Sequence, residues 1–83
     1  MITIQFYFRN GDKECYCHPT TFPAVPAQNH AIELETFLPD DVSLKDLYLG
    51  LNEVLMPDKY TWTLDEELGL FLLIELKIAK SLN

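Results

Sequence analysis

The residues best suited to chemistry lie together near the N-terminus, beginning in the segment KECYCHP. The chain has two cysteines and two histidines, and all four fall between Cys15 and His30. Thiolates and imidazoles are ligands that zinc prefers, and a cysteine beside a histidine can also act as a nucleophile with its base. Cys15, Cys17, His18 and His30 are therefore the candidates for a metal site, a redox pair or a catalytic pair.

The strand that precedes these residues predicts how they are oriented. Residues 2–9 alternate strictly, with Ile2, Ile4, Phe6 and Phe8 on one face and polar side chains or Tyr7 on the other, which is typical of a half-buried β-strand. The dipeptide Asn10-Gly11 follows and favours a two-residue hairpin turn. Residues 12–18 are then the returning strand.

In this hairpin Phe6 faces Cys15 and Ile4 faces Cys17, and directly opposed residues share a face of the sheet. Both cysteines then join the apolar face, while His18 points away. A C-x-C-H cluster in a strand divides its ligands between two faces and departs from the usual C-x2-4-C spacing. We therefore interpret the cysteines as small core residues, with no disulfide between them and no metal or cofactor.

The middle of the chain predicts a loop, a strand and a helix. Residues 19–28 contain three prolines and indicate an ordered extended loop. Residues 31–37 alternate again, with apolar side chains facing in and Glu33 and Glu35 facing out. Residues 43–56 carry a helical apolar pattern with Ser43 as the N-cap and Asp46 in the first turn, and Pro57 ends the helix.

The C-terminal segment has two interpretations. Residues 60–64 and 70–78 suit the two strands of a hairpin, with Gly69 in the turn. Alternatively, Thr63 and Glu66 form a capping box and residues 64–82 form one helix. We favour the hairpin because residues 60–64 need a pairing partner.

These elements predict a single α+β domain over residues 1–83. It has a small, mainly antiparallel sheet, made of an N-terminal hairpin, a middle strand and a C-terminal hairpin, with one helix packed on it. The run AIELETFLPDDVSLKDLYLGL is similar to the second strand, acidic turn and helix of ubiquitin-like β-grasp domains. The resemblance implies a fold only, because the chain lacks the Gly-Gly tail that this family uses for conjugation.

The charge is negative and unevenly distributed. The net charge is −7, and residues 33–67 hold ten acidic residues against two lysines, a local net charge of −8. Direct binding to nucleic acid needs a basic surface, so this charge argues against it. No apolar run reaches the roughly 20 residues of a membrane span, and the N-terminus lacks a signal-peptide pattern. We expect a cytoplasmic protein.

No phosphate-binding, dinucleotide-binding, metalloprotease or hydrolase motif is present in the sequence. We therefore expect a protein-binding module rather than an enzyme. The leading hypothesis is a stoichiometric inhibitor whose carboxylates replace nucleic-acid phosphates on a basic partner. Anti-CRISPR, anti-restriction and immunity proteins of phages and mobile elements are similar in size and charge. The predicted contacts are Glu33, Glu35, Asp40, Asp41, Asp58, Asp65, Glu66 and Glu67.

The alternative is a ubiquitin-like adaptor or an assembly subunit, including a homodimer, that binds through an apolar patch. Its predicted contacts are Leu49, Phe37, Tyr7 and Tyr16. The two hypotheses differ in salt dependence, because an interface driven by charge weakens steeply as ionic strength rises.

Overall fold

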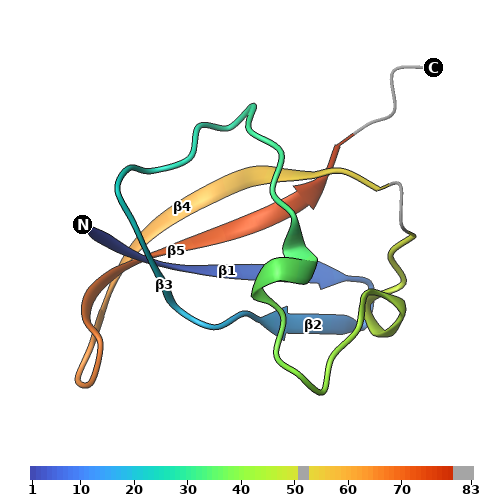
Figure 1. The fold of residues 1–83 in the computed structure, drawn as a ribbon, viewed down its shortest axis with the longest axis horizontal. Coiled ribbons are helices and arrows are strands. Elements are labelled where there is room, and N and C mark those ends of the chain that lie inside the picture. Colours follow the sequence, from blue (N-terminus) through green and yellow to red (C-terminus); the bar gives the residue numbers. More distant parts are fainter. Residues whose placement is uncertain (51–52, 80–83) are drawn as a thin grey trace.

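The chain forms one mixed five-stranded sheet in a computed structural model that describes residues 1–50 and 53–79 (Figure 1). The strands are β1 (Ile2–Asn10), β2 (Lys13–Tyr16), β3 (Thr20–Phe22), β4 (Leu55–Asp65) and β5 (Gly69–Ile78), with two short 3-10 helices, η1 (Leu34–Phe37) and η2 (Leu44–Leu47). The sheet order is β2-β1-β5-β4, and β3 also pairs with β1. The described residues contain no α-helix. The α+β prediction is therefore correct only in part: the sheet with its two hairpins is present, but the packed α-helix is not, and the fold is mostly β.

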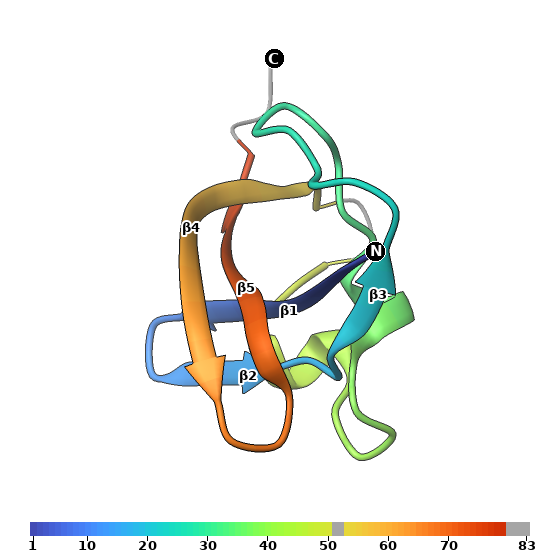
Figure 2. The same ribbon diagram turned by 90° about the vertical axis from the view of Figure 1, so that its left-hand side faces the viewer.

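The central pair of strands, β1 and β5, is parallel, with Phe6 opposite Ile74. The mainly antiparallel sheet predicted above lacks this pairing. The two hairpins, β1 with β2 and β4 with β5, are antiparallel as predicted. Figure 2 shows that the loop after β3 and both 3-10 helices lie on one side of the sheet. The core fills the space between them.

The N-terminal hairpin turns one residue later than Asn10-Gly11 predicts, which shifts every cross-strand partner by two residues. Asn10 pairs with Lys13, so the turn is Gly11 and Asp12, and Gly11 has a φ of 65°. A positive φ at the first turn position alone is the pattern of a type II′ turn, which favours glycine there. Cys15 then faces Phe8. A shift of two leaves every side chain on its predicted face.

The returning strand is split around Pro19. β2 ends at Tyr16, the N–H of Cys17 still donates to the carbonyl of Phe6 at 2.9 Å, and β3 pairs with the first half of β1. Proline cannot donate to a sheet ladder, so it interrupts the strand without ending the pairing. Part of the loop predicted over residues 19–28 is therefore strand β3.

The helix predicted over residues 43–56 is wrong, although its N-terminal signal is right. Ser43 and Asp46 form the capping box, but the turn ends at Tyr48, which has left-handed φ and ψ angles of 58° and 33°. The Tyr48 and Leu49 N–H groups then donate to Lys45 and Leu44, a Schellman-type ending. Leu47 and Leu49 are both buried, which one face of a continuous helix cannot achieve. Residues 51–52 lie outside the described residues.

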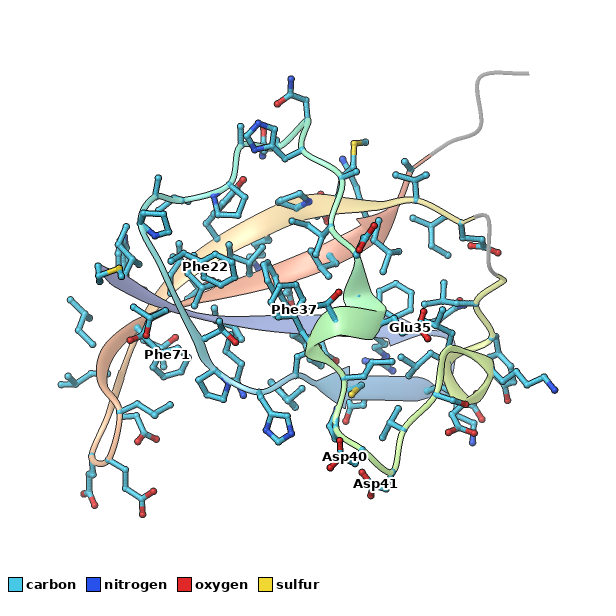
Figure 3. The ribbon with its side chains drawn as sticks, viewed as in Figure 1. Phe22, Glu35, Phe37, Asp40, Asp41 and Phe71 are labelled. Atoms are coloured by element: carbon cyan, nitrogen blue, oxygen red, sulfur yellow. The ribbon has the colours of Figure 1, made fainter. Side chains whose placement is uncertain are left out.

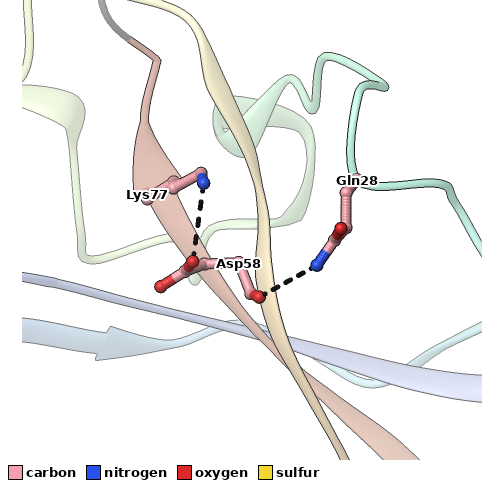
Figure 4. Close-up of polar contacts among 3 residues, drawn as sticks. All are labelled: Gln28, Asp58 and Lys77. Carbon is pink, nitrogen blue, oxygen red and sulfur yellow. Dashed lines mark hydrogen bonds and ion pairs between the residues drawn. The ribbon is translucent and has the colours of Figure 1, made fainter.

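β4 begins before the proline that was predicted to end the helix. Pro57 lies in this edge strand, where a missing N–H is tolerated. A register shift between Pro57 and Lys59 leaves Asp58 unpaired as a bulge. Before the bulge Leu55 and Pro57 face the core, and after it Tyr60 does, so the inward positions change from odd to even residue numbers. Asp58 contacts Lys77 at 3.5 Å, and its carbonyl accepts a hydrogen bond from Gln28 at 3.4 Å (Figure 4).

Residues 31–37 do not form the predicted strand, yet their alternation is correct. Ile32 makes an isolated bridge to Leu55, and η1 follows. Ile32 and Leu34 point inward, whereas Glu33 and Glu35 are exposed. Phe37 completes an aromatic cluster, with its ring centroid 5.0 Å from that of Phe6 and 5.8 Å from that of Phe22.

The C-terminal hairpin is confirmed. β5 runs from Gly69, whose φ is 73°, to Ile78. Leu72, Ile74 and Leu76 are buried in the core cluster. The helical alternative over residues 64–82 is wrong for residues 64–79, and its last three residues lie outside the described part of the chain.

Candidate protein-binding site

The cysteine and histidine candidates do not meet in a reactive site. Cys15 and Cys17 are buried among the core residues, and burial raises the pKa of the Cys17 thiol to about 12 and also raises that of Cys15. His18 is exposed, and His30 accepts the Ala27 N–H at 3.2 Å. Residues 1–50 and 53–79 hold no group of three or more ligands that could bind a metal ion. Both thiols therefore fill the core as uncharged side chains.

The eight acidic residues predicted as contacts are all exposed, but they lie in separate places. Glu33 and Glu35 flank the start of η1, Asp40 and Asp41 form the turn between η1 and η2, and Asp58 is the bulge of β4. The remaining three occupy the tip of the β4–β5 hairpin. Figure 3 shows Asp40 and Asp41 projecting from their turn, away from Glu35.

Two of these acidic segments project from the same side of the molecule. The turn that carries Asp40 and Asp41 and the β4–β5 tip both lie at the bottom in Figures 1 and 2, at different positions along the long axis. We call this surface the acidic end, defined by Asp40, Asp41, Asp65, Glu66 and Glu67. None of these five forms an ion pair with another described residue; the one such pair joins Lys77 to Asp58. Within the described residues, no ion pair therefore neutralises the charges of the acidic end.

The tip of the hairpin is held in place by one of its own carboxylates. Asp65 Oδ1 accepts the N–H of Glu67 at 2.8 Å and that of Leu68 at 2.9 Å. These backbone hydrogen bonds, the Leu68 bond most of all, lower the pKa of Asp65. Asp65 therefore shapes the turn, and the side chains of Glu66 and Glu67 are left free to contact a partner.

Sequence reasoning missed an apolar surface on the same hairpin. Trp62, Leu64 and Leu70 share the face of Ile74, yet they are 58%, 81% and 63% exposed. We call these three residues the hairpin stripe. The alternation of residues 60–64 is the signal that could have found it, because it places Trp62 and Leu64 on one face.

The four residues predicted as the apolar patch of an adaptor do not form one surface. Leu49 is buried, and Phe37 packs against Phe6 and Phe22. Tyr7 and Tyr16 do lie together on the outer face, with ring centroids 4.5 Å apart. The Tyr7 hydroxyl donates to Glu14 at 2.6 Å, and this bond raises the Tyr7 pKa to about 12.

Two hollows border η1. One, of about 580 Å³, has leucines in its lining and three acidic residues, Glu33, Glu35 and Glu53. The other, of about 540 Å³, lies beneath the loop after β3 and is lined by Phe6, Phe22 and Phe37 among others. Glu33 and Glu35 therefore belong to the edge of a hollow, apart from the acidic end.

Comparisons with known proteins identify no relative of this chain. No family model matches the chain, and no curated protein or solved structure matches it. In the described ranges, no helix is long and apolar enough to cross a membrane. The function therefore has to be argued from the surfaces of the chain itself.

Proposed function

We propose that this protein is a non-enzymatic binding module whose acidic end occupies a basic surface of a partner protein. The kind of partner surface that fits best is one that otherwise binds nucleic acid, and the protein then acts as a stoichiometric inhibitor. Carboxylates on a folded scaffold take the place of phosphates, and their field accelerates the encounter.

The observation that carries this proposal is that two acidic loops project from one side of the molecule. Asp40 and Asp41 sit on one loop near the middle of the long axis, and Asp65, Glu66 and Glu67 sit on another at its extremity (Figures 1 and 2). Neither the turn LPDDVS nor the tip DEELG contains a basic residue. Adjacent like charges within each loop repel one another at a cost to folding, which a basic partner would relieve.

The eight predicted contacts do not contribute equally. Glu66, Glu67, Asp40 and Asp41 are the direct contacts in this proposal, and Asp65 positions two of them. Asp58 already has Lys77 as a partner. We expect Glu33 and Glu35 to add to the long-range field without touching the partner.

The test is capture of partner proteins from a lysate by the full-length chain at about 0.1 M and about 0.5 M salt, with and without added DNA. We expect the captured partner to be released by high salt and displaced by DNA, because both weaken contacts to a basic surface. Capture should fall sharply for a variant that neutralises the acidic end: Asp40→Asn, Asp41→Asn, Glu66→Gln and Glu67→Gln.

The matched control removes the same charge elsewhere through Asp12→Asn, Glu33→Gln, Glu35→Gln and Glu53→Gln. It should keep most of the capture. If both variants lose capture equally, net charge rather than the acidic end drives binding. A partner that stays bound at high salt and ignores DNA would contradict the proposal.

The hairpin stripe favours a second candidate, an adaptor or assembly subunit that docks through apolar contacts. Such a complex persists at about 0.5 M salt, because burial of apolar surface is little affected by ionic screening. The same capture experiment therefore separates the two candidates.

A further inference from the structure

The apolar face of the β4–β5 hairpin continues past the end of the core. Ile74 is fully buried opposite Tyr60, and Leu72 is 2% exposed opposite Trp62. Beyond this point the same face is solvent-exposed, at Trp62 and then at the directly opposed pair of Leu64 and Leu70. More than half of each of these three residues stays exposed to solvent.

Folding alone does not explain these residue types. A threonine or a charged residue would suit an exposed strand position at least as well, and exposed apolar residues on an edge strand invite unwanted association. Tryptophan is also one of the residues that most often anchor a protein interface. The hairpin stripe therefore has the composition of a contact surface.

The neighbouring charges restrict what can cover the stripe. Leu64 is followed directly by Asp65, Glu66 and Glu67. A second copy paired through the same stripe would bring its own Asp65, Glu66 and Glu67 to this tip, so repulsion disfavours it. A partner with cationic side chains beside an apolar cleft can contact both the apolar stripe and the acidic residues of the tip.

We infer that the hairpin stripe and the adjacent acidic tip, Asp65, Glu66 and Glu67, form one docking surface. The occupant is a protein cleft with apolar walls and a lysine- or arginine-rich border. This inference rests on the proposed function and adds the apolar half of its interface. The acidic residues accelerate the encounter and orient the partner. Trp62, with Leu64 and Leu70 beside it, is the apolar anchor of the interface.

The chain carries its own reporter, because Trp62 is its single tryptophan. The experiment titrates the full-length protein with two synthetic peptides of equal length and charge, one alternating lysine with leucine and one alternating lysine with serine. We expect the lysine–leucine peptide to shift Trp62 emission to shorter wavelength and to bind about 30-fold more tightly, the effect of one interface hot spot. The lysine–serine peptide should bind weakly without a shift.

The variants separate the two halves of the surface. Leu64→Thr with Leu70→Thr keeps strand-forming residues and should remove the preference for the lysine–leucine peptide. Val25→Thr, at a residue 39% exposed on another loop, should leave the preference unchanged. Glu66→Gln with Glu67→Gln should weaken binding of both peptides, and Glu33→Gln with Glu35→Gln should weaken it much less.

Other outcomes overturn the inference in distinguishable ways. Equal binding of both peptides without an emission shift, still dependent on Glu66 and Glu67, would remove the stripe and leave the proposed function standing. Binding that needs the stripe but not Glu66 and Glu67 would contradict the proposed function. A shift that appears as the protein is concentrated, together with a doubled mass in sedimentation, would show that a second copy covers the stripe.

Discussion

The carboxylate of Asp65 accepts the backbone N–H of Leu68 at 2.9 Å, three residues further along the β4–β5 turn. The same oxygen accepts the N–H of Glu67. The most acidic part of the hairpin is therefore shaped by one of its own acids. Charge and turn geometry are coupled at Asp65, and this coupling can be measured.

We predict that Asp65→Ala accelerates hydrogen exchange at the Glu67 and Leu68 amides, because both lose their acceptor. The effect should depend on pH. Since the Asp65 pKa is lowered from 3.8 in the folded state, its contribution to stability is present above pH 3.8 and is lost as the pH falls through the folded pKa. Amide exchange followed by NMR between pH 2 and 6 checks this, over a range that spans the usual aspartate pKa.

The control for this prediction is Asp65→Asn, which keeps an acceptor oxygen but cannot ionise. Its exchange rates at the two amides should show no step in protection across the acid range. Identical pH dependence in the wild type and in Asp65→Asn would show that another group controls the turn.

We predict that Tyr7 ionises only near pH 12, because its hydroxyl donates a hydrogen bond to Glu14. The folded state favours the neutral phenol, so this bond stabilises the protein below pH 10.0, the ordinary tyrosine pKa, and its contribution is lost as the pH rises through about 12. A spectrophotometric phenolate titration should lose the step near pH 12 in Tyr7→Phe.

Glu14→Gln tests the cause of the Tyr7 shift. It removes the charge of the acceptor and should return the Tyr7 step toward its ordinary pKa. An unchanged titration in this variant would mean that the Tyr7–Glu14 hydrogen bond does not form in solution.

We predict very different costs for two truncations on the same face of β5. Ile74→Ala should lower the free energy of unfolding by about 2–5 kcal/mol, because Ile74 is fully buried. Leu70→Ala should cost about 0.2–1 kcal/mol, the value of one cross-strand pair, because Leu70 is 63% exposed. Urea unfolding measures both. Equal costs would place Leu70 in the core and remove it from the hairpin stripe.

We predict that iodoacetamide does not label native Cys15 or Cys17 at mildly alkaline pH, because the thiolate is the reactive form and burial raises both thiol pKa values. Denaturant should expose both thiols to labelling, as counted by mass spectrometry. Tyr16→Cys is the matched control: this position lies between the two cysteines but is 55% exposed, and a thiol there should react rapidly. Native labelling of either natural cysteine would contradict its place in the core.

Local sequence patterns were sufficient to predict the faces of the strands. Strict alternation in residues 2–9 placed Ile4 and Phe6 inward, and the hairpin placed both cysteines beside them, even though the true turn lies at Gly11 and Asp12. The reason is that the side-chain period of a strand is two, so a register error of two residues changes the partners and leaves the faces unchanged.

The capping signal at Ser43 and Asp46 was also correct, but it determined only one turn of 3-10 helix. The ten residues of β5 pair with an eleven-residue β4 that starts at Leu55, and this pairing takes residues that the apolar pattern assigned to a helix. Long-range strand pairing outweighs the weak local preference for helix. Only the tertiary structure could decide this competition.

The candidate site divides in the same way. The sequence by itself determined that the chain is acidic and where along it the acidic residues lie, because charge depends on residue type alone. Which of them lie on one side of the molecule, and which apolar residues stay exposed, was decided by how the strands assemble into one sheet. The parallel pairing of β1 with β5 joins residues 68 positions apart, such as Ile4 and Leu72, a contact that no local pattern encodes.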